Sequence, residues 1–412
     1  MANVSSSNGL EKRPKLRFPG FDEPWKVFKA EELFQNVTDK NHPDETVLTI
    51  IQGKGTLPRE QAGRNIHYDD ASLSNYKKVE QGDFIIHLRS FEGGLEMANE
   101  AGIVSPAYTI LRCKRPHSSL FYDAYFHTDE FINHNLSKSV EGIRDGRQIS
   151  YEAFKWLGIP YCEPTEQEQI SSLFSVLNER IAKQRNLVES LKKYKRGLSN
   201  SLFDRLSAGS ESRLCIFGDM MTILQNNTFS RDNLSVGGNG VRNIHYGDVL
   251  IKYGAVLDLH SENVPVINAE QDISKFSALS YLRNGDVVFA DTAEDYTVGK
   301  STEIIGAENI AALSGLHTIP CRPQDSFAPM YLGYYFNSDY FKKQLYPMIQ
   351  GTKVSSISKS EIIKTKIIVP CLQEQTRIAS IMSALDDRID AAKHTTKGLI
   401  DLRSGLLQQL FI

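Results

Sequence analysis

Residues 170–203 read ISSLFSVLNERIAKQRNLVESLKKYKRGLSNSLF, and residues 378–411 read IASIMSALDDRIDAAKHTTKGLIDLRSGLLQQLF. The two segments align without gaps, and eleven of the 34 aligned positions are identical, including Arg180 with Arg388 and Phe203 with Phe411. Two long segments of one chain that agree in this way indicate an internal repeat.

Further markers recur outside these segments, and they do so in the same order. They are Glu166-Gln167 with Glu374-Gln375, Ile149-Ser150 with Ile357-Ser358, Gly82-Asp83 with Gly285-Asp286, and RNIHY at 64–68 with RNIHY at 242–246. The spacing between the copies becomes shorter toward the N-terminus, so the two halves differ by insertions there. The chain is therefore a tandem duplication, in which a variable module and a shared helix each occur twice.

The shared segments have the apolar spacing of long helices. Apolar residues recur at alternating steps of four and three, which makes a heptad stripe over about four heptads. A helix of this length extends roughly 50 Å and cannot bury its stripe alone, so we expect the two helices to pair. The expected pairing residues are Ile170, Phe174, Leu177, Ile181, Leu191, Leu198 and Leu202 in the first helix, and Ile378, Met382, Leu385, Ile389, Leu399, Leu406 and Leu410 in the second. Gln184, Lys195 and Arg403 interrupt the stripe and are candidates for setting its register.

The segments between the helices predict mixed α/β modules with many loops. Short β-branched and aromatic runs, bounded by Gly, Pro, Asn and Asp, are typical of strands. In each module the sequence also predicts one aromatic-rich helix, near 122–135 in the first and 331–345 in the second. We expect a tail (1–16), a first module (17–165), a first helix (166–205), a second module (206–372) and a second helix (373–412).

Composition bounds the class of protein. A length of 412 residues suits two or three compact units, and a net charge of −3 does not by itself indicate a nucleic-acid partner. Between Arg180 and Arg205 there is a run rich in Lys and Arg, which is either a solvated helix face or a local basic surface. The five cysteines are scattered singly, which argues against disulfides and a zinc site and fits a reducing cytosol. The sequence contains no apolar run of about 18 residues, the length needed to span a membrane. We therefore expect a cytoplasmic protein.

The motifs of a nucleic-acid enzyme are missing. The chain has no Asn/Asp-Pro-Pro-aromatic segment, and its one Gly-rich stretch, 236–240, follows polar residues, which favours a flexible loop over a cofactor loop. Gly299-Lys300-Ser301 resembles the end of a P-loop, but Glu294 stands where the first glycine belongs. There is no His-Glu-x-x-His pair and no Gly-x-Ser-x-Gly elbow. The sequence therefore indicates a binding protein that catalyses nothing itself.

Three features together resemble one known family. They are the opening Arg17-Phe-Pro-Gly-Phe21 with Trp25, the Gly-Asp pair before a strand, and the Ile-Ser…Pro…Glu-Gln…Ile run that leads into each long helix. In this order, and twice over, they resemble the specificity subunits of type I restriction–modification systems. One departure is the helix entry, which reads Cys162-Glu-Pro-Thr in the first copy and Val-Pro-Cys-Leu-Gln in the second.

The resemblance implies both a fold and a function. It implies α/β (α+β) target-recognition domains in tandem, each followed by a long helix, with the two helices paired as an antiparallel coiled coil in a pseudo-twofold arrangement. Each domain would read one half of a bipartite site on double-stranded DNA, and the helices would fix the spacing. Two methylation subunits would bring S-adenosylmethionine, and motor–nuclease subunits would bring ATP and Mg, so that this chain binds no cofactor or metal.

Candidate DNA contacts are polar residues and glycines in loops, because Arg and Lys hold phosphates and base edges are read by hydrogen bonds. They are Arg64, Asn65, Arg89, Arg144, Gly146, Arg147, Gln148, Arg242, Asn243, Lys252, Lys353, Ser355 and Ser356. His67, Tyr68, His245 and Tyr246 of the repeated RNIHY segments are further candidates, but a scaffold role is favoured for them, since the two halves should read different bases. Glu166-Gln167 and Glu374-Gln375 either are first-turn charges of the helices or touch the methylation subunit.

Three other functions stay open at this point. A self-contained methyltransferase or nuclease would bind a cofactor alone, which the missing motifs disfavour. A coiled-coil scaffold whose modules bind protein or glycan would show no salt-dependent DNA affinity. A specificity subunit of a methylation-only complex would have no nuclease partner.

Overall fold

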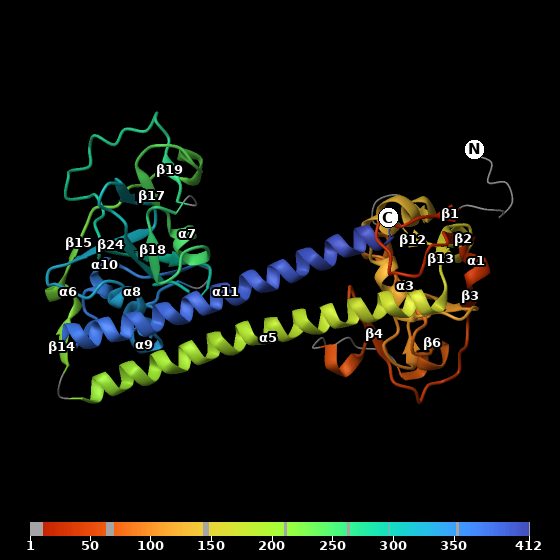
Figure 1. Cartoon of the computed structure of the whole chain (residues 1–412). Coiled ribbons are helices and arrows are strands. Elements are labelled where there is room, and N and C mark those ends of the chain that lie inside the picture. Colours follow the sequence, from red (N-terminus) through yellow and green to blue (C-terminus); the bar gives the residue numbers. More distant parts are fainter. Residues whose placement is uncertain are drawn as a thin grey trace. The chain divides into compact units, whose positions relative to one another are not determined.

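The computed structural model describes residues 11–62, 70–142, 148–209, 212–261, 264–295, 297–351 and 354–411. These residues form two compact units: unit 1 comprises Met1–Arg185 and His394–Ile412, and unit 2 comprises Asn186–Lys393. Each long helix therefore contributes to both units. The first, α5 (Pro164–Ala208), begins in unit 1 and ends in unit 2, and the second, α11 (Leu372–Phe411), does the reverse (Figure 1).

Unit 1 is built on a four-stranded antiparallel sheet in the order β3-β10-β7-β8. Its strands are β3 (Phe34–Val37), β10 (Thr109–Cys113), β7 (Phe84–Ile86) and β8 (Glu96–Met97). A smaller sheet pairs β1 (Glu11–Lys12), β2 (Trp25–Lys29) and β13 (Gly158–Tyr161). Three two-stranded antiparallel sheets pair β4 (Leu48–Ile51) with β5 (Gly55–Pro58), β6 (Lys77–Val79) with β9 (Gly102–Val104), and β11 (Val140–Glu141) with β12 (Gln148–Ile149). The short helices are α1 (Ala30–Leu33), α2 (Ser90–Gly93), α3 (Ser119–Phe126) and α4 (Tyr151–Phe154), with a π-helix at Glu130–Asn135.

Unit 2 repeats this plan. Its main sheet has the order β15-β24-β20-β22-β18, from β15 (Met221–Ile223), β24 (Thr318–Pro323), β20 (Val287–Ala290), β22 (Ser301–Ile305) and β18 (Val256–Asp258). Smaller sheets pair β14 (Arg213–Ile216) with β26 (Lys366–Val369), β21 (Thr292–Ala293) with β25 (Ser355–Ser356), and β16 (Leu234–Ser235), β19 (Val266–Ile267), β17 (Arg242–Ile244) and β23 (Ala312–Ser314) with one another. The helices are α6 (Phe217–Met220), α7 (Tyr246–Ile251), α8 (Tyr331–Phe336), α9 (Asp339–Leu345) and α10 (Lys359–Ile362).

The repeated Gly-Asp pair forms the same local structure in the two main sheets. In each unit the glycine adopts a positive φ, +91° at Gly82 and +85° at Gly285, which a side chain disfavours. The aspartate that follows is buried and forms a bidentate ion pair with an arginine of the neighbouring strand. Asp83 accepts from Arg112 at 2.9 and 2.7 Å, and Asp286 accepts from Arg322 at 2.9 and 2.6 Å. The predicted class of tandem α/β modules with long helices is confirmed.

Aromatic residues fill both cores, and each core receives the end of a long helix. Phe411 of α11 lies among Trp25, Phe121, Tyr125 and Phe174 in unit 1, with ring centroids 5.1–6.3 Å apart. In unit 2 the repeat-related Phe203 of α5 lies 6.2 Å from Tyr331 and 5.2 Å from Tyr335. Both phenylalanines are fully buried. The identical Leu-Phe ends of the two helices are therefore core residues.

The predicted pairing residues of the two long helices are buried to different extents. The buried members are Ile170, Phe174, Leu177, Ile181 and Leu202 on α5, and Ile378, Met382, Leu385, Ile389 and Leu410 on α11. Leu191, Leu198, Leu399 and Leu406 are half-buried. Within unit 2 the two helices run antiparallel, because Lys195 pairs with Asp386 and, ten residues further along α5, Arg205 pairs with Glu374. Lys195, which interrupts the apolar stripe, therefore forms an ion pair between the two helices.

The five cysteines are free thiols. Within the described ranges, none of the helices is both long and apolar enough to cross a lipid bilayer. The same residues contain no group of three His, Cys, Asp or Glu side chains arranged to hold a metal ion.

A buried ionisable group makes the stability of unit 1 depend on pH. Both oxygens of Glu96 accept backbone hydrogen bonds, from Gly53 at 2.6 Å and Gly55 at 2.8 Å, and His127 Nε2 lies 3.4 Å from the same carboxylate. Burial alone lowers the pKa of His127, but the hydrogen bond to Glu96 and the charge of Asp123 outweigh it and raise this pKa above its usual value. The folded state therefore favours the protonated imidazole.

We expect His127→Gln to destabilise unit 1 most in acid. A group whose pKa is higher in the folded state contributes its full stability when the pH is below its pKa in the unfolded state, about 6.5 for histidine. This contribution is lost as the pH rises through the pKa in the folded state. The gap in melting temperature between the wild type and the variant should therefore be widest below that pH and narrow as the pH rises. Thermal unfolding from pH 5.5 to 8.5 measures the gap, and a gap that widens toward high pH would contradict the assignment.

Candidate nucleic-acid interface

In unit 1 the predicted DNA contact Gln148 lies on a small pair of strands. Strands β11 and β12 pair Glu141 with Gln148, and the turn between them begins at Gly142, whose φ is +89°. Gln148 is exposed. Arg144, Gly146 and Arg147 lie outside the described residues, as do Arg64 and Asn65 of the first RNIHY segment.

Arg89 lies beside this hairpin. It precedes helix α2, and α2 packs against β12. The Arg89 side chain is 69% exposed and forms a surface ion pair with Glu92 at 3.0 Å. Because such exposed pairs are weak, the guanidinium can leave Glu92 for another partner. The structure thus brings Arg89 and Gln148 to one edge of unit 1.

Unit 2 has the same hairpin in the corresponding place. Gly351 takes a φ of +103°, and Gln350 pairs across the turn with Ser356. The strand β25, formed by Ser355 and Ser356, then pairs with β21, which follows the central strand β20. Ser356 is exposed and Ser355 is half-buried, whereas Lys353 lies outside the described residues.

Three residues lie next to this hairpin, and only Tyr246 belongs to a segment that the sequence singles out. His317 Nδ1 is 3.4 Å from Asp291 Oδ1, and the His317 ring lies 5.3 Å from that of Tyr246. Asp291 immediately precedes β21, so the group adjoins β25. His317 has a φ of +54°, which is unusual for a residue with a side chain, and strained residues concentrate at functional sites. No local pattern marks Asp291 or His317, whereas Tyr246 ends the repeated RNIHY segment.

The second RNIHY segment is mostly scaffold. Asn243 has no exposed surface, and its Oδ1 accepts a hydrogen bond from Asn227 at 2.7 Å. A side chain without exposed surface cannot reach DNA, so the selection of Asn243 as a contact is not supported. Arg242 is half-buried and donates to the carbonyl oxygen of Val264 at 2.8 Å. Arg242, Asn243 and Ile244 form strand β17, so this segment is part of the sheet framework of unit 2.

Lys252 lies apart from the hairpin group. It caps the C-terminal end of α7, whereas Tyr246 begins this helix. Its Nζ is 2.9 Å from the buried carboxylate of Asp248, which also pairs with Arg231 at 2.8 Å. The lysine therefore satisfies a buried charge, although half of its side chain is exposed.

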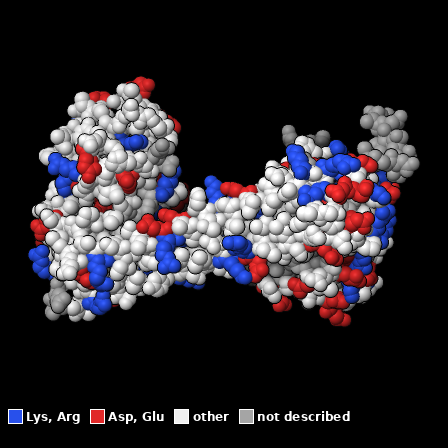
Figure 2. Space-filling view, viewed as in Figure 1, with Lys and Arg blue, Asp and Glu red and all other residues white. Residues whose placement is uncertain are grey.

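The basic run of α5 is largely neutralised. Lys183 pairs with Glu179, Lys192 with Glu189, Lys195 with Asp386, and Arg196 with Asp339. Figure 2 shows Lys and Arg interspersed with Asp and Glu on the visible face of each unit. These pairs favour a solvated helix face over a basic DNA-binding strip.

The Gln of each Glu-Gln pair holds a long helix to its own module. Gln167 accepts from the backbone nitrogen of Ser118 at 3.0 Å and donates to the carbonyl oxygen of Cys162 at 2.8 Å. Gln375 repeats both bonds, with Ala328 at 2.9 Å and Pro370 at 2.8 Å. Both amides are buried. They are therefore structural clamps, and neither is available to a partner subunit.

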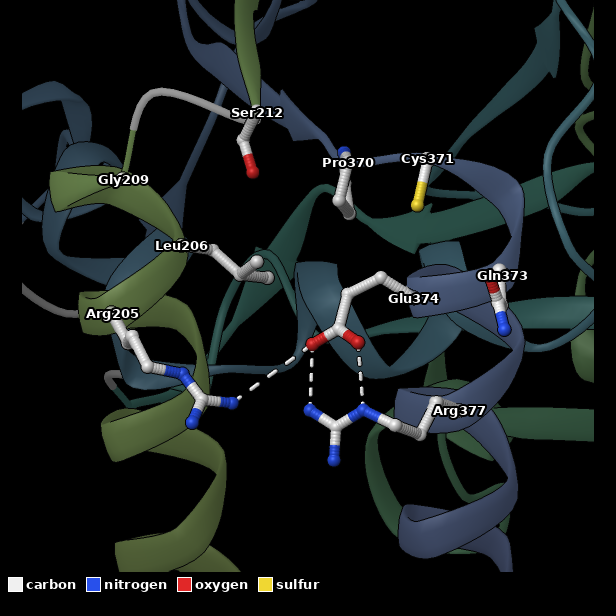
Figure 3. Close-up of a pocket in the computed structure, with 9 residues that line it drawn as sticks. All are labelled: Arg205, Leu206, Gly209, Ser212, Pro370, Cys371, Gln373, Glu374 and Arg377. Carbon is white, nitrogen blue, oxygen red and sulfur yellow. Dashed lines mark hydrogen bonds and ion pairs between the residues drawn. The ribbon is translucent and has the colours of Figure 1, made fainter.

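The Glu of each pair has a different environment. Glu166 is buried and accepts two hydrogen bonds from Arg17 and one from Trp25 Nε1. Glu374 lines an open pocket between α5 and α11, where it binds Arg377 at 2.6 Å and Arg205 at 3.9 Å (Figure 3). The pocket also includes the exposed thiol of Cys371. It contains none of the predicted DNA contacts.

Comparison with known proteins identifies the second half of the chain. Residues 218–400 match the family model of the type I restriction modification DNA specificity domain. This part of the chain is similar to type I specificity domains. The matched residues include the hairpin of unit 2 together with Asp291, His317 and Tyr246. The resemblance drawn from the sequence motifs is confirmed for this part of the chain.

Solved structures share the fold of the whole chain. The HsdS subunit from Thermoanaerobacter tengcongensis is 20% identical, with a TM-score of 0.50 over 97% of this chain and 98% of that one. The type I restriction-modification system S subunit from M. genitalium is 15% identical, with a TM-score of 0.54 over 97% and 99%. A chain from a structure on complex assembly and conformational transition of the type I R-M system is 19% identical, with a TM-score of 0.57 over 97% and 99%. Among curated proteins, none matches this chain.

Proposed function

We propose that this chain is the DNA sequence-reading subunit of a type I restriction–modification complex and that each module reads one half of a bipartite site. One observation carries the proposal. Both units have a related main sheet and hairpin, but the side chains there differ: the exposed Gln148 corresponds to the exposed Ser356, and the exposed Arg89, at the start of α2, corresponds to the half-buried Thr292. A shared frame that presents different hydrogen-bonding groups suits two half-sites of different sequence.

In this proposal the chain is not catalytic, and its partners supply the chemistry. Two methylation subunits bring S-adenosylmethionine, and motor–nuclease subunits bring ATP and Mg. Repeat-related apolar residues remain exposed on the long helices, namely Tyr194 on α5 and Leu402 on α11, which are 60% and 50% exposed. Equivalent surfaces on a duplicated chain suit two copies of one partner.

We expect that exchanging residues 17–165 for the first module of another such subunit changes one half of the target and leaves the other half unchanged. The measurement is single-molecule methylome sequencing of a naive host that expresses the chain with and without its methylation subunit. A new bipartite methylated motif that requires both proteins would support the proposal. A soluble complex that methylates no motif would overturn it and favour a coiled-coil scaffold.

A further arm separates the two kinds of complex. Adding the motor–nuclease subunit and ATP to the purified methylation complex should yield cleavage of unmethylated DNA that carries the motif. Methylation without cleavage under these conditions would indicate a subunit of a methylation-only complex.

A further inference from the structure

The end of the central strand differs in chemistry between the two units. The shift that places Gly82-Asp83 on Gly285-Asp286 also places Leu88 and Arg89 on Asp291 and Thr292. The strand pairing agrees, because Ile86 of β7 pairs with Thr109 of β10, and Phe289 of β20 pairs with Ile319 of β24. At these two equivalent positions, unit 1 therefore has an apolar side chain and a guanidinium, whereas unit 2 has a carboxylate and a hydroxyl.

Neighbouring groups hold the Asp291 carboxylate in place. Its Oδ1 accepts the Thr292 hydroxyl at 2.8 Å and lies 3.4 Å from His317 Nδ1. Its Oδ2 has no hydrogen-bond donor among the described residues, and a quarter of the side chain is exposed. The backbone also fixes this residue, because Asp291 donates to the carbonyl oxygen of His317 and accepts from the nitrogen of Ile357. One carboxylate oxygen is thus oriented and still able to accept a hydrogen bond.

The surroundings suit a nucleic-acid backbone. Ser356 is exposed on β25 and pairs with Thr292 across the strands. The exposed Lys359 contacts Asn226 at 3.3 Å, and Asn226 in turn donates to the carbonyl oxygen of Gly315, two residues before His317. Cations and hydroxyls of this kind hold phosphates and set register, whereas they carry no sequence information.

A carboxylate at such a position is selective. It only accepts hydrogen bonds, and the phosphates repel it, so its partner on DNA must be a donor at a base edge. In the major groove the donors are the exocyclic amino groups, N4 of cytosine and N6 of adenine. We propose that Asp291, oriented by Thr292 and His317, reads the amino group of one cytosine or adenine in the half-site of unit 2. This inference rests on the proposed function and adds to it the chemistry of one contact.

The test uses the full chain in complex with its methylation subunit, and DNA that carries the methylated motif. Asp291→Asn keeps the size of the side chain but replaces an acceptor with a donor. We expect it to reduce discrimination at one base pair of one half-site by about 5- to 150-fold, the usual contribution of a good base contact. Discrimination in the other half-site should not change, which provides an internal control. Asp272→Asn removes an exposed charge elsewhere in unit 2 and is the matched control.

Base analogues identify the contacted group. Purine in place of adenine, or 2-pyrimidinone in place of cytosine, removes only the amino group. At the contacted position the analogue should weaken binding by the wild type and have little further effect on Asp291→Asn. Equal losses in both proteins, or a variant with unchanged discrimination, would overturn the assignment while leaving the proposed function intact. A wild-type complex that discriminates at neither half-site would instead overturn the proposed function itself.

Discussion

Replacing Phe411 with alanine should lower the free energy of unfolding of unit 1 by about 3–5 kcal/mol, as expected for the loss of a fully buried phenylalanine. The ring lies at the centre of four aromatic side chains, those of Trp25, Phe121, Tyr125 and Phe174. Because Phe411 is the last described residue of α11, its loss also weakens the attachment of this helix end to the core of unit 1.

Tryptophan fluorescence measures this effect selectively. The chain has two tryptophans, Trp25 and Trp156, and both belong to unit 1. Urea unfolding followed by their emission should therefore show a large shift for Phe411→Ala. The matched control is Phe203→Ala, which removes the repeat-related ring from unit 2 and should leave the tryptophan transition nearly unchanged. Equal shifts for both variants would show that the two units unfold as one.

Glu166→Ala should destabilise unit 1 by about 3–5 kcal/mol, which is typical when one partner of a buried ion pair is removed. The variant leaves Arg17, whose side chain is 15% exposed, without its carboxylate and leaves the Trp25 indole nitrogen without an acceptor. The same fluorescence assay measures the change. The emission maximum of the folded variant should also differ from that of the wild type, because Trp25 loses a hydrogen bond.

The control for this variant is the repeat-related Glu374→Ala. Glu374 is partly exposed and bonds mainly to Arg377, one turn along the same helix. Surface pairs of this kind contribute about 0–1 kcal/mol, so circular dichroism of the variant during urea unfolding should show little change. A loss for Glu374→Ala as large as that for Glu166→Ala would contradict the different burial of the two residues.

The duplication, the long helices and the α/β modules could be predicted from the sequence because each leaves a pattern along the chain. Heptad spacing from Ile170 to Leu202 reflects one helix face, and the repeated Gly-Asp pair reflects one strand entry with a positive φ at glycine. Such signals depend on neighbours within a few residues. Their order, found twice, also pointed to the family whose specificity domain matches residues 218–400.

The candidate site was only partly predictable. The hairpin residues Gln148, Ser355 and Ser356 were selected because glycine and polar loops favour recognition, and they lie on equivalent hairpins. Asn243 was selected from the same kind of evidence, yet it is buried. A repeated polar residue serves equally as a contact or as scaffold, and only the burial of its side chain separates the two.

Tertiary structure alone decided three features. It brought Asp291 and His317 together with Tyr246 at the start of α7, gave Glu166 and Glu374 opposite environments at the same place in the repeat, and divided each long helix between two units. The physical reason is that burial and charge pairing depend on side chains distant in the sequence. The sequence by itself determined which elements form and that they occur twice, because backbone conformation and apolar periodicity are local properties.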